Sequence, residues 1–432
     1  MNHSEQNTPS RRPLVTAVLL LCTAALAVLF ALLPAQQPKE RNGGRLNLAE
    51  EYRTGMADRL ALVPLSDAKE AAPAKTASET KSQTPATEPV PAPTKPKDTD
   101  PSSEPVETIP PATQPEETEP TQPPKKRYRI PESSLAAPLP DVNAYGVADT
   151  PADMAPILEQ AADVLEGQKL LFTTEVEPYR DSKVYYYLDE TIFSVVWKEK
   201  IDGSVFTFAE VKVMDPSQFR RYLSGGAFGS GKLNLTSEMS KSVNAVVGCS
   251  ADFYAYRYEG ITVVDGVVEK VKPGVPDNCF VDYDGNLILE QNRAFSGKEE
   301  VQEYVDKNNI SFSISFGPAL VKDGEFCCTR EYRLGQVYYN YPRAAICQMD
   351  RLHYLYVVSN AEDFATNMLP MMQFANRVAE TGCLQAYAVD GGQTSTVVMN
   401  NEVRNHVNYG SERPISDIIY FATAKPAEEG NP

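Results

Sequence analysis

The residues best suited to chemistry lie near the C-terminus, where one acid is followed by two glycines and a cluster of hydroxyl side chains. The apolar run 386–389 precedes Asp390. That run has the composition of a strand, so the acid is expected at a strand end. Gly391 and Gly392 can adopt positive φ or let backbone N–H groups approach a ligand. The hydroxyl cluster consists of Thr394, Ser395 and Thr396. The segment predicts a functional site, and a hairpin with a polar turn is the alternative interpretation.

Further acids and arginines near predicted strand ends could complete this site. They are Asp252, Arg343 and the adjacent Glu412 and Arg413. Arginines together with hydroxyl and backbone N–H groups suit a phosphate oxyanion. Carboxylates supply the base or nucleophile that a glycosidic carbon needs. Each of these residues could also form an ordinary ion pair.

Histidine and cysteine are too few or too poorly spaced to predict a metal centre. Only His353 and His406 lie beyond the N-terminal tail, which excludes a multi-histidine site. His353 falls in an alternating strand pattern and is interpreted as structural, whereas His406 is a candidate for substrate contact. No cysteine pair has Cys-x-x-Cys spacing, so structural zinc is not expected. The six cysteines of the folded region could form disulfides, but spacing does not choose among the pairings.

The N-terminal third predicts a membrane anchor and a stem. Residues 14–33 form an apolar stretch of the length that crosses a bilayer. We therefore expect a cytoplasmic tail (1–12) and a signal anchor (13–34), with the following part of the chain extracytoplasmic. Basic residues flank the stretch on both sides, so the charge rule does not decide the orientation, and a cytosolic domain held at the membrane is the alternative. Residues 35–140 are rich in Pro, Thr and Glu and are predicted to be a disordered stem.

The remaining region, 141–425, predicts an α+β domain with a largely antiparallel sheet and a few packed helices. Helices are expected over 152–166, 298–307 and 362–381, the last with Pro370 inside it. Strands are expected over 169–176, 184–188, 191–197, 205–213 and 386–389. Asp-Gly turns predict hairpins within 261–268, 280–289 and 319–326. The formal charge of −17 argues against binding to nucleic acid.

The run from 244 to 421 resembles the phosphodiester glycosidase family. Five elements occur in family order: S-A-D-F-Y (250–254), F-G-P-A-L-V-K-D-G (316–324), P-R-A-A-I (342–346), D-G-G-Q-T-S-T (390–396) and E-R-P-I-S-D-I-I (412–419). The chain departs from the family pattern at Ser250, Cys347 and Gln393, which puts the identity of the sugar in question more than the fold.

The resemblance implies a hydrolase that cleaves a sugar-1-phosphodiester in a phosphorylated glycan or cell-envelope polymer. Together with the expected anchor and stem, this predicts a membrane-anchored, extracytoplasmic enzyme. Arg343 and Arg413, with Gly391, Gly392 and the hydroxyls of Thr394, Ser395 and Thr396, are expected to bind the substrate. Asp390, Glu412 or Asp252 would activate water or stabilise an oxocarbenium-like centre.

Other functions remain open. The main alternative is a non-catalytic protein of the cell envelope that binds glycan phosphates or has a structural role. A metal-dependent phosphodiesterase is disfavoured by the scarcity of histidine. No cofactor is expected, although a divalent cation could bind at Asp252 and Asp390.

Overall fold

The structure, a computed structural model, describes residues 128–131, 136–275, 277–329 and 338–426. The predicted tail and membrane span, and most of the predicted stem, lie outside these residues and remain predictions. Among the described residues, no helix is long and apolar enough to cross a membrane. The stem was predicted to continue to residue 140, but β1 (Tyr128–Arg129) pairs with β21 (Lys425–Pro426). Residues 128–131 therefore belong to the folded region, where Tyr128 and Ile130 are buried.

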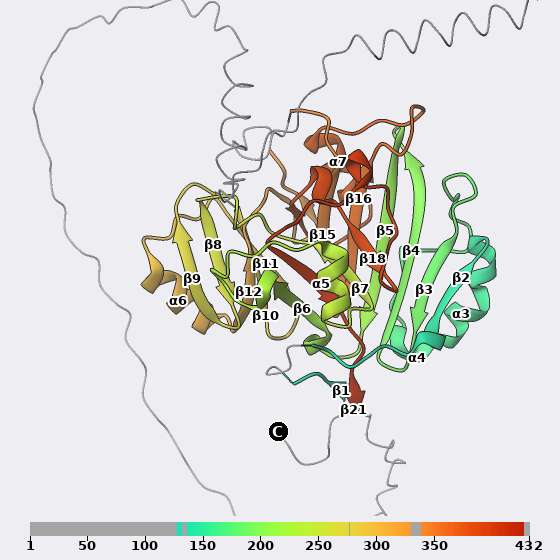
Figure 1. Cartoon of the computed structure of the whole chain (residues 1–432), viewed down its shortest axis with the longest axis horizontal. Helices are drawn as coiled ribbons and strands as arrows, with labels where there is room; N and C mark the ends of the chain where they lie inside the picture. The colour runs from blue at the N-terminus through green and yellow to red at the C-terminus, as the bar shows by residue number, and fades with distance from the viewer. Residues whose placement is uncertain (1–127, 132–135, 276, 330–337, 427–432) are drawn as a thin grey trace, which may run out of the picture. The chain divides into compact units, whose positions relative to one another are not determined.

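A nine-stranded antiparallel sheet forms the centre of the folded region, in the order β14-β13-β17-β15-β16-β5-β4-β3-β2 (Figure 1). Its strands are β2 (Tyr145–Ala148), β3 (Val184–Leu188), β4 (Ile192–Ile201), β5 (Ser204–Val213), β13 (Ala319–Lys322), β14 (Glu325–Phe326), β15 (Arg343–Asp350), β16 (His353–Asn360) and β17 (Gln385–Val389). Asp202 and Gly203 both have positive φ and connect β4 to β5, which confirms the predicted hairpin.

Apart from the β1–β21 pair, three smaller antiparallel groups pack beside this sheet. A five-stranded sheet, in the order β19-β18-β7-β20-β6, contains β6 (Phe219–Leu223), β7 (Val247–Ser250), β18 (Val397–Met399), β19 (Glu402–Val403) and β20 (Asp417–Phe421). A three-stranded sheet contains β10 (Asp277–Asp282), β11 (Leu287–Gln291) and β12 (Ile310–Ile314), and a ribbon joins β8 (Gly260–Val264) to β9 (Val267–Lys272). Every strand pair described is antiparallel, so the predicted α+β class with a largely antiparallel architecture is confirmed.

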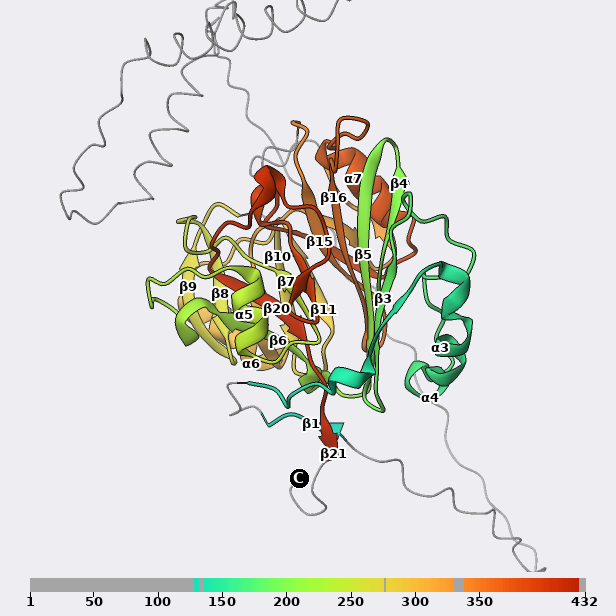
Figure 2. The same ribbon diagram turned by 45° about the vertical axis from the view of Figure 1, so that its right-hand side comes forward.

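Both faces of the nine-stranded sheet are buried. On β4, Val196 faces a core shared with the five- and three-stranded sheets, whereas Val195 and Trp197 face a second core. The second core is covered by α7 (Met371–Ala379) and by α3 (Ala155–Gln160) with α4 (Ala162–Leu165) (Figure 2). This explains why β4 and β5 lack the polar alternation of a strand with one solvated face.

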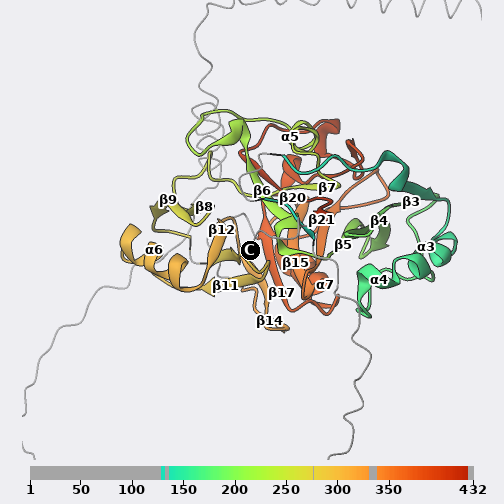
Figure 3. The same cartoon turned by 90° about the horizontal axis from the view of Figure 1, so that it is seen from below.

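The remaining helices cover the smaller sheets. The helix α5 (Thr236–Ser242) packs on β7 and β20, and α6 (Lys298–Lys307) packs on β9 and β12. Viewed from below, α6 and the ribbon lie at one end of the fold and α3 with α4 at the other (Figure 3). The bounds of α6 are those predicted from the sequence.

The region 141–240 belongs to the same core as the family-like motifs. Strands β2 to β5 continue the nine-stranded sheet, since β5 pairs with β16 along its length. Strand β6 pairs with β20 in the five-stranded sheet. The segment therefore completes the fold instead of forming a separate subdomain.

Two predicted elements differ in the structure. The helix predicted over 362–381 begins only at Met371, with Pro370 as its N-cap. Proline suits a helix start because its missing N–H would have no partner in the first turn. The strand predicted over 169–176 is absent, because the N–H groups of Leu171 and Phe172 donate to the Glu210 carboxylate and not to a neighbouring strand. By contrast, the helix predicted over 152–166 is present as short helical turns that end at Glu166.

The six cysteines of the folded region are free thiols in the structure. They are Cys249, Cys279, Cys327, Cys328, Cys347 and Cys383. Burial raises the pKa of Cys327 to about 11 and that of Cys328 to about 12, so both favour the protonated form. Low-pKa thiolates are the reactive form of cysteine, and these two thiols therefore do not resemble catalytic nucleophiles.

We predict that Phe219→Ala lowers the free energy of unfolding by about 3–5 kcal/mol. The Phe219 ring stacks on Phe421 with ring centroids 4.8 Å apart and also contacts Phe312 and Tyr354, so it joins three of the sheets. Denaturant unfolding of purified protein measures the change. Leu139→Ala, at a residue that is 77% exposed, is the matched control and should unfold as the wild type does.

Candidate active site

Strand register brings the predicted site segments to one end of two sheets. In the nine-stranded sheet, the last residue of β17, Val389, pairs with Ala344 at the start of β15. In the five-stranded sheet, Ser250 at the end of β7 pairs with Ile418 at the start of β20. The first residue of β18 pairs with Cys249 in the same region. The acid, arginine and hydroxyl segments that flank these ends are therefore neighbours.

The segment 390–396 crosses from one sheet to the other. It follows β17 of the nine-stranded sheet and leads into β18 of the five-stranded sheet. The Asp390 N–H donates to the Ala251 carbonyl at 2.9 Å and fixes the crossing to the end of β7. The alternative interpretation of the segment as a simple hairpin is therefore wrong, because β17 and β18 are not paired.

The two glycines allow this crossing to pass close to β15. A Cβ on Gly391 would lie 2.7 Å from the Pro342 carbonyl oxygen, and the Gly392 N–H donates to that oxygen at 2.8 Å. Gly392 also has a φ of 68°. These contacts explain why both residues are glycine. Whether either one contacts substrate remains a prediction.

Asp390 and Arg413 form the central ion pair of the site. Arg413 Nη2 lies 3.0 Å from Asp390 Oδ2, and the Asp390 residue is only 5% exposed. Burial raises the pKa of Asp390 to about 6, while the positive charges of Arg413 and Arg257 oppose that rise. A carboxyl group with this pKa can exchange a proton near neutral pH, as a general acid or base must.

Several buried polar atoms in these segments have no hydrogen-bond partner among the described residues. They are Ser395 Oγ, Thr396 Oγ1 and Arg413 Nε. Buried polar groups in folded proteins are nearly always paired, so a group of such atoms beside one ion pair suits a polar ligand. Thr394 differs, since its hydroxyl donates to the Gly391 carbonyl at 2.7 Å and braces the turn.

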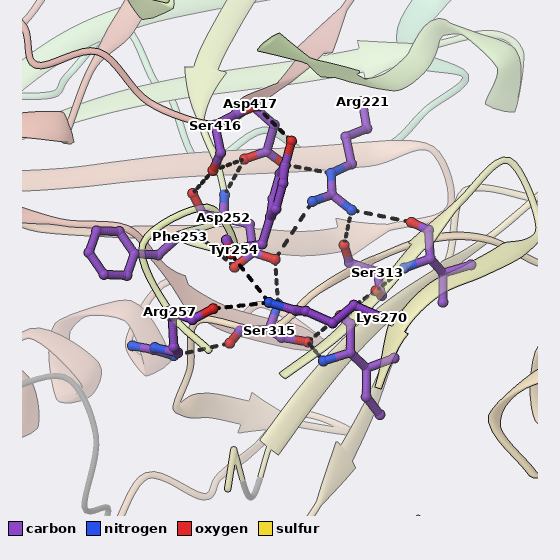
Figure 4. A network of polar contacts seen from close by, with 12 residues as sticks. Arg221, Asp252, Phe253, Tyr254, Arg257, Lys270, Ser313, Ser315, Ser416 and Asp417 are labelled. Atoms are coloured by element: carbon purple, nitrogen blue, oxygen red, sulfur yellow. Dashed lines mark hydrogen bonds and ion pairs between the residues drawn. The ribbon is translucent and has the colours of Figure 1, made fainter. Parts of the chain in front are cut away.

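Asp252 lies in a buried network with Arg221 and Asp417 (Figure 4). Arg221 Nε lies 2.5 Å from Asp417 Oδ2, and its Nη2 lies 3.6 Å from Asp252 Oδ2. The Asp252 oxygens also accept the N–H groups of Phe253 and Ser315 at 2.7 and 3.1 Å. Asp417 accepts the Asp252 N–H at 2.9 Å. These contacts hold Asp252 as an anchor for the chain that follows it.

That chain, the loop 252–259, presents aromatic rings and a further arginine. Arg257 Nη1 donates to the carbonyl oxygens of Ser315 and Phe316 at 3.1 and 2.8 Å. The guanidinium groups of Arg257 and Arg413 both lie near the Phe253 ring, at 5.8 and 5.5 Å from its centroid. The loop thus brings a second cation close to Asp390.

Lys270, on β9, supports the same loop from within. Its Nζ donates to the carbonyl oxygens of Tyr254, Arg257 and Glu259 at 3.1–3.4 Å (Figure 4). Burial lowers the pKa of this lysine. The loop is therefore held at its start by Asp252 and along its length by Lys270.

Glu412 is directed toward the start of α5. Its carboxylate accepts the Ser237 N–H at 3.1 Å and also the Ser237 hydroxyl. A carboxylate that accepts first-turn N–H groups stabilises a helix start. The structure thus gives Glu412 a capping role, and its catalytic role remains a prediction.

Arg343 lies beside the glycine turn through its backbone, but its side chain contacts other groups. The guanidinium donates to the carbonyl oxygens of Tyr339 and Leu369 at 2.6 and 3.4 Å. Burial lowers the pKa of Arg343 to about 10. The raised pKa of Asp390 comes mainly from burial, and the neighbouring charges that modify it are those of Arg413, Arg257 and Asp252. Substrate binding by Arg343 therefore remains a prediction.

The two histidines also occupy separate places. His353 is buried on β16, and its Nε2 lies 2.9 Å from Glu210 Oε1, in keeping with the structural role expected from the sequence. His406 is exposed and lines a cavity away from Asp390, which Arg404 and Lys183 also line. Substrate contact by His406 remains a prediction.

The residues around Asp390 and Asp252 do not suit a divalent cation. Among the described residues, no group of three His, Cys, Asp or Glu side chains is placed to hold a metal ion. The carboxylates of Asp252 and Asp390 face arginines and N–H donors. Cation sites instead need several oxygen ligands directed at one point.

Four residues of this arrangement were missed from the sequence: Arg221, Arg257, Lys270 and Asp417. Asp417 lies inside the quoted E-R-P-I-S-D-I-I element, and Arg257 follows S-A-D-F-Y by only a few positions. Their charge beside a family-like motif was an available signal. Arg221 and Lys270 lie on strands outside the motifs and carried no such signal.

Gln393, a departure from the family pattern, donates a hydrogen bond from its side-chain amide to the Ser411 carbonyl at 3.0 Å.

This chain is similar in sequence to a prophage-derived bacterial protein. The SPbeta prophage-derived uncharacterized protein YomE of Bacillus subtilis (strain 168) is 20% identical over 241 residues, which is 54% of this chain and 36% of that protein. This chain thus spans about a third of that relative.

Two solved structures are also similar. The catalytic domain of zebrafish N-acetylglucosamine-1-phosphodiester alpha-N-acetylglucosaminidase, auto-inhibited by its pro-peptide, is 16% identical with a TM-score of 0.44, covering 60% of this chain and 92% of that one. A hypothetical protein from Synechocystis is 12% identical with a TM-score of 0.40, covering 57% and 64%.

The family comparison is more direct. Residues 243–422 match the family model described as phosphodiester glycosidase. The matched range contains the crossing segment, the loop 252–259 and Arg413, and its bounds agree with the resemblance found from the motifs at 244–421. The resemblance of this chain to the phosphodiester glycosidase family is therefore confirmed for residues 243–422.

Proposed function

We propose that the protein hydrolyses a sugar-1-phosphodiester in a phosphorylated glycan or cell-envelope polymer, with Asp390 as the catalytic carboxylate. The observation that supports this most is the position of Asp390, a buried acid whose pKa is raised to about 6, beside Arg413 and near Arg257. The family match over the same residues supports the same reaction class.

In this mechanism the two arginines bind the phosphate. Arg413 and Arg257 provide N–H groups and positive charge, which suit a phosphodiester anion. The unpaired hydroxyls of Ser395 and Thr396 are available to hold the substrate further. Because a phosphate monoester is a good leaving group, the reaction needs little help from a general acid.

The Asp390 carboxylate then acts on water. It accepts a proton from the water that attacks the anomeric carbon, while the bond from that carbon to the phosphate oxygen breaks. One acid is sufficient for this step, which agrees with the anchoring contacts of Asp252 and the capping contacts of Glu412. In this proposal Asp252 is a positioning residue that holds the loop carrying Arg257.

We also propose that the protein acts outside the membrane. The apolar stretch 14–33 and the proline-rich stem support an anchor followed by a spacer. A polymer of the cell envelope is the substrate class that such a placement would reach.

Purified protein is expected to hydrolyse members of a panel of sugar-1-phosphodiesters and envelope polymers. Asp390→Asn should lower kcat by about 10²–10⁴-fold, because the amide cannot accept the proton. In ¹⁸O-water the label should enter the sugar. Label in the phosphate product would show cleavage of the P–O bond and contradict the glycosidase mechanism. Tight glycan binding with no turnover would favour the non-catalytic alternative.

Activity should depend on pH through Asp390, with kcat/KM falling as pH drops below about 6, because the base must be ionised. Arg413→Ala should lower kcat/KM by about 10–100-fold and move this limb to higher pH, since loss of the positive charge raises the pKa of Asp390 further. Arg257→Ala should move it in the same direction by less.

Arg377→Ala is the matched control for these two variants. Arg377 is a surface arginine paired with Asp202 and Glu380, so its loss should leave the pH profile unchanged. A limb that stays in place in Arg413→Ala, or that moves to lower pH, would assign the titration to another group.

The proposed placement predicts that protease added to intact cells digests the stem and releases or degrades the folded domain. A cytoplasmic marker protein should remain intact in the same sample. If the domain becomes sensitive only after the cells are lysed, it lies on the cytosolic side of the membrane.

A further inference from the structure

A cavity lies between the ribbon β8–β9 and the end of the sheet formed by β10 and β11. Its volume is about 540 Å³, within the range of small-ligand sites, which is roughly 300–1,000 Å³. Its lining includes Lys272, Asp277, Asn278, Gln291, Asn292 and Phe295. The combination of amide, carboxylate and aromatic side chains differs from the arginine pair near Asp390.

Asn278 is the residue that points to a ligand. It is only 2% exposed, yet it lines the cavity. One end of its side-chain amide lies 2.8 Å from the Ser315 oxygen, whose single proton also reaches the Ile261 carbonyl at 2.6 Å. The other polar atom of the amide makes no hydrogen bond within the part of the chain that the structure describes. This atom is not among the fully buried unpaired atoms, so it can reach the cavity, where a ligand hydroxyl can either donate to it or accept from it.

The charges around the cavity favour a neutral ligand over an anion. Arg293 is already paired with Glu290 at 3.0 Å, and its guanidinium stacks on Phe295. The Lys272 ammonium lies over the Tyr258 ring at 5.2 Å. Asp277 is buried, and burial raises its pKa. Both cations that line the cavity are therefore engaged with other side chains, which leaves little positive charge for a phosphate group.

We infer that this cavity is a subsite for a neutral sugar ring, separate from the Asp390 site. Amide donors and acceptors match sugar hydroxyls, and the apolar wall of Ile261, Val271 and Phe295 matches the C–H face of a pyranose. The inference goes beyond the proposed hydrolysis, because it concerns binding by residues that do not contact Asp390.

Ser315 connects the two sites. Its N–H donates to Asp252, its carbonyl accepts from Arg257, and its hydroxyl contacts Asn278. A sugar in the cavity therefore lies next to the segment that positions Arg257. This placement gives a polymer with a phosphodiester at one unit a place for a neutral unit nearby.

Methyl-labelled protein tests the inference by NMR, with Ile261, Val271 and Val275 as reporters in the cavity wall. The probes are methyl glycosides of neutral hexoses and of N-acetylhexosamines, with inorganic phosphate as the anionic comparison. We expect saturable shifts of these methyl signals with at least one sugar. Asp390→Asn should lose turnover but retain the shifts, which separates this subsite from the reaction.

Two exposed positions allow the cavity to be changed without disturbing the core. Asn292 has a φ of 53°, so Asn292→Gly removes its amide without strain, and Lys272→Ala removes the neighbouring ammonium. The double variant should bind the sugar about tenfold more weakly, since one or two hydrogen bonds are lost. Lys307→Ala, on α6 in the same part of the fold, is the matched control and should bind as the wild type does.

Asn278→Ala is the more direct variant, and its folding is checked by the remaining methyl signals. It too should weaken sugar binding. Absence of shifts with every sugar, or equal shifts in the wild type and the double variant, overturns the inference. Phosphate that shifts these methyls at lower concentration than any sugar would show an anion site instead. Shifts that persist while no phosphodiester is cleaved would support the subsite and count against the proposed hydrolysis alone.

Discussion

The site depends on one constraint: the chain must leave the nine-stranded sheet at Val389 and enter the five-stranded sheet at Val397. The Asp390 N–H bonds to the Ala251 carbonyl, so the two sheet ends cannot separate without breaking this contact. The glycine turn passes so close to Pro342 that a side chain on Gly391 would collide with its carbonyl oxygen. As a result, an acid from one sheet meets an arginine that precedes a strand of the other.

The acids that looked alike in the sequence become different in the structure because their surroundings differ. Asp252 accepts two N–H groups and faces Arg221, and these contacts order the loop that follows it. Asp390 is also buried, but burial outweighs the favourable charge of Arg413 and raises its pKa to about 6. When two acids of one site have different surroundings, one often has a structural role and the other a role in proton transfer.

Much of the fold followed from the sequence because local signals determined it. Asp202-Gly203 required a tight hairpin, and the spacing of apolar residues in 298–307 required a helix with the bounds observed. The failures came from tertiary contacts. Glu210 is far from Leu171 in sequence, so its capture of that backbone could not be read from the segment 169–176. Motif order likewise identified Asp390 and Arg413, whereas Arg221 became visible only when β6 paired with β20.

The position of Asp390 also has a cost for stability. Its pKa in the folded chain, about 6, exceeds the ordinary value of 3.8, so the folded chain holds this proton more tightly than the unfolded chain. The stabilisation of the folded chain by protonated Asp390 is fully present below about pH 4 and is lost as pH rises through about 6. At neutral pH its loss lowers the free energy of unfolding by on the order of 3 kcal/mol. The buried contacts of Arg221, Lys270 and Asp252 hold the surrounding loop in place against this cost. An acid that served only the fold would be expected to accept several N–H groups, as Asp252 does. The opposite placement of Asp390 is what a proton-transfer role requires.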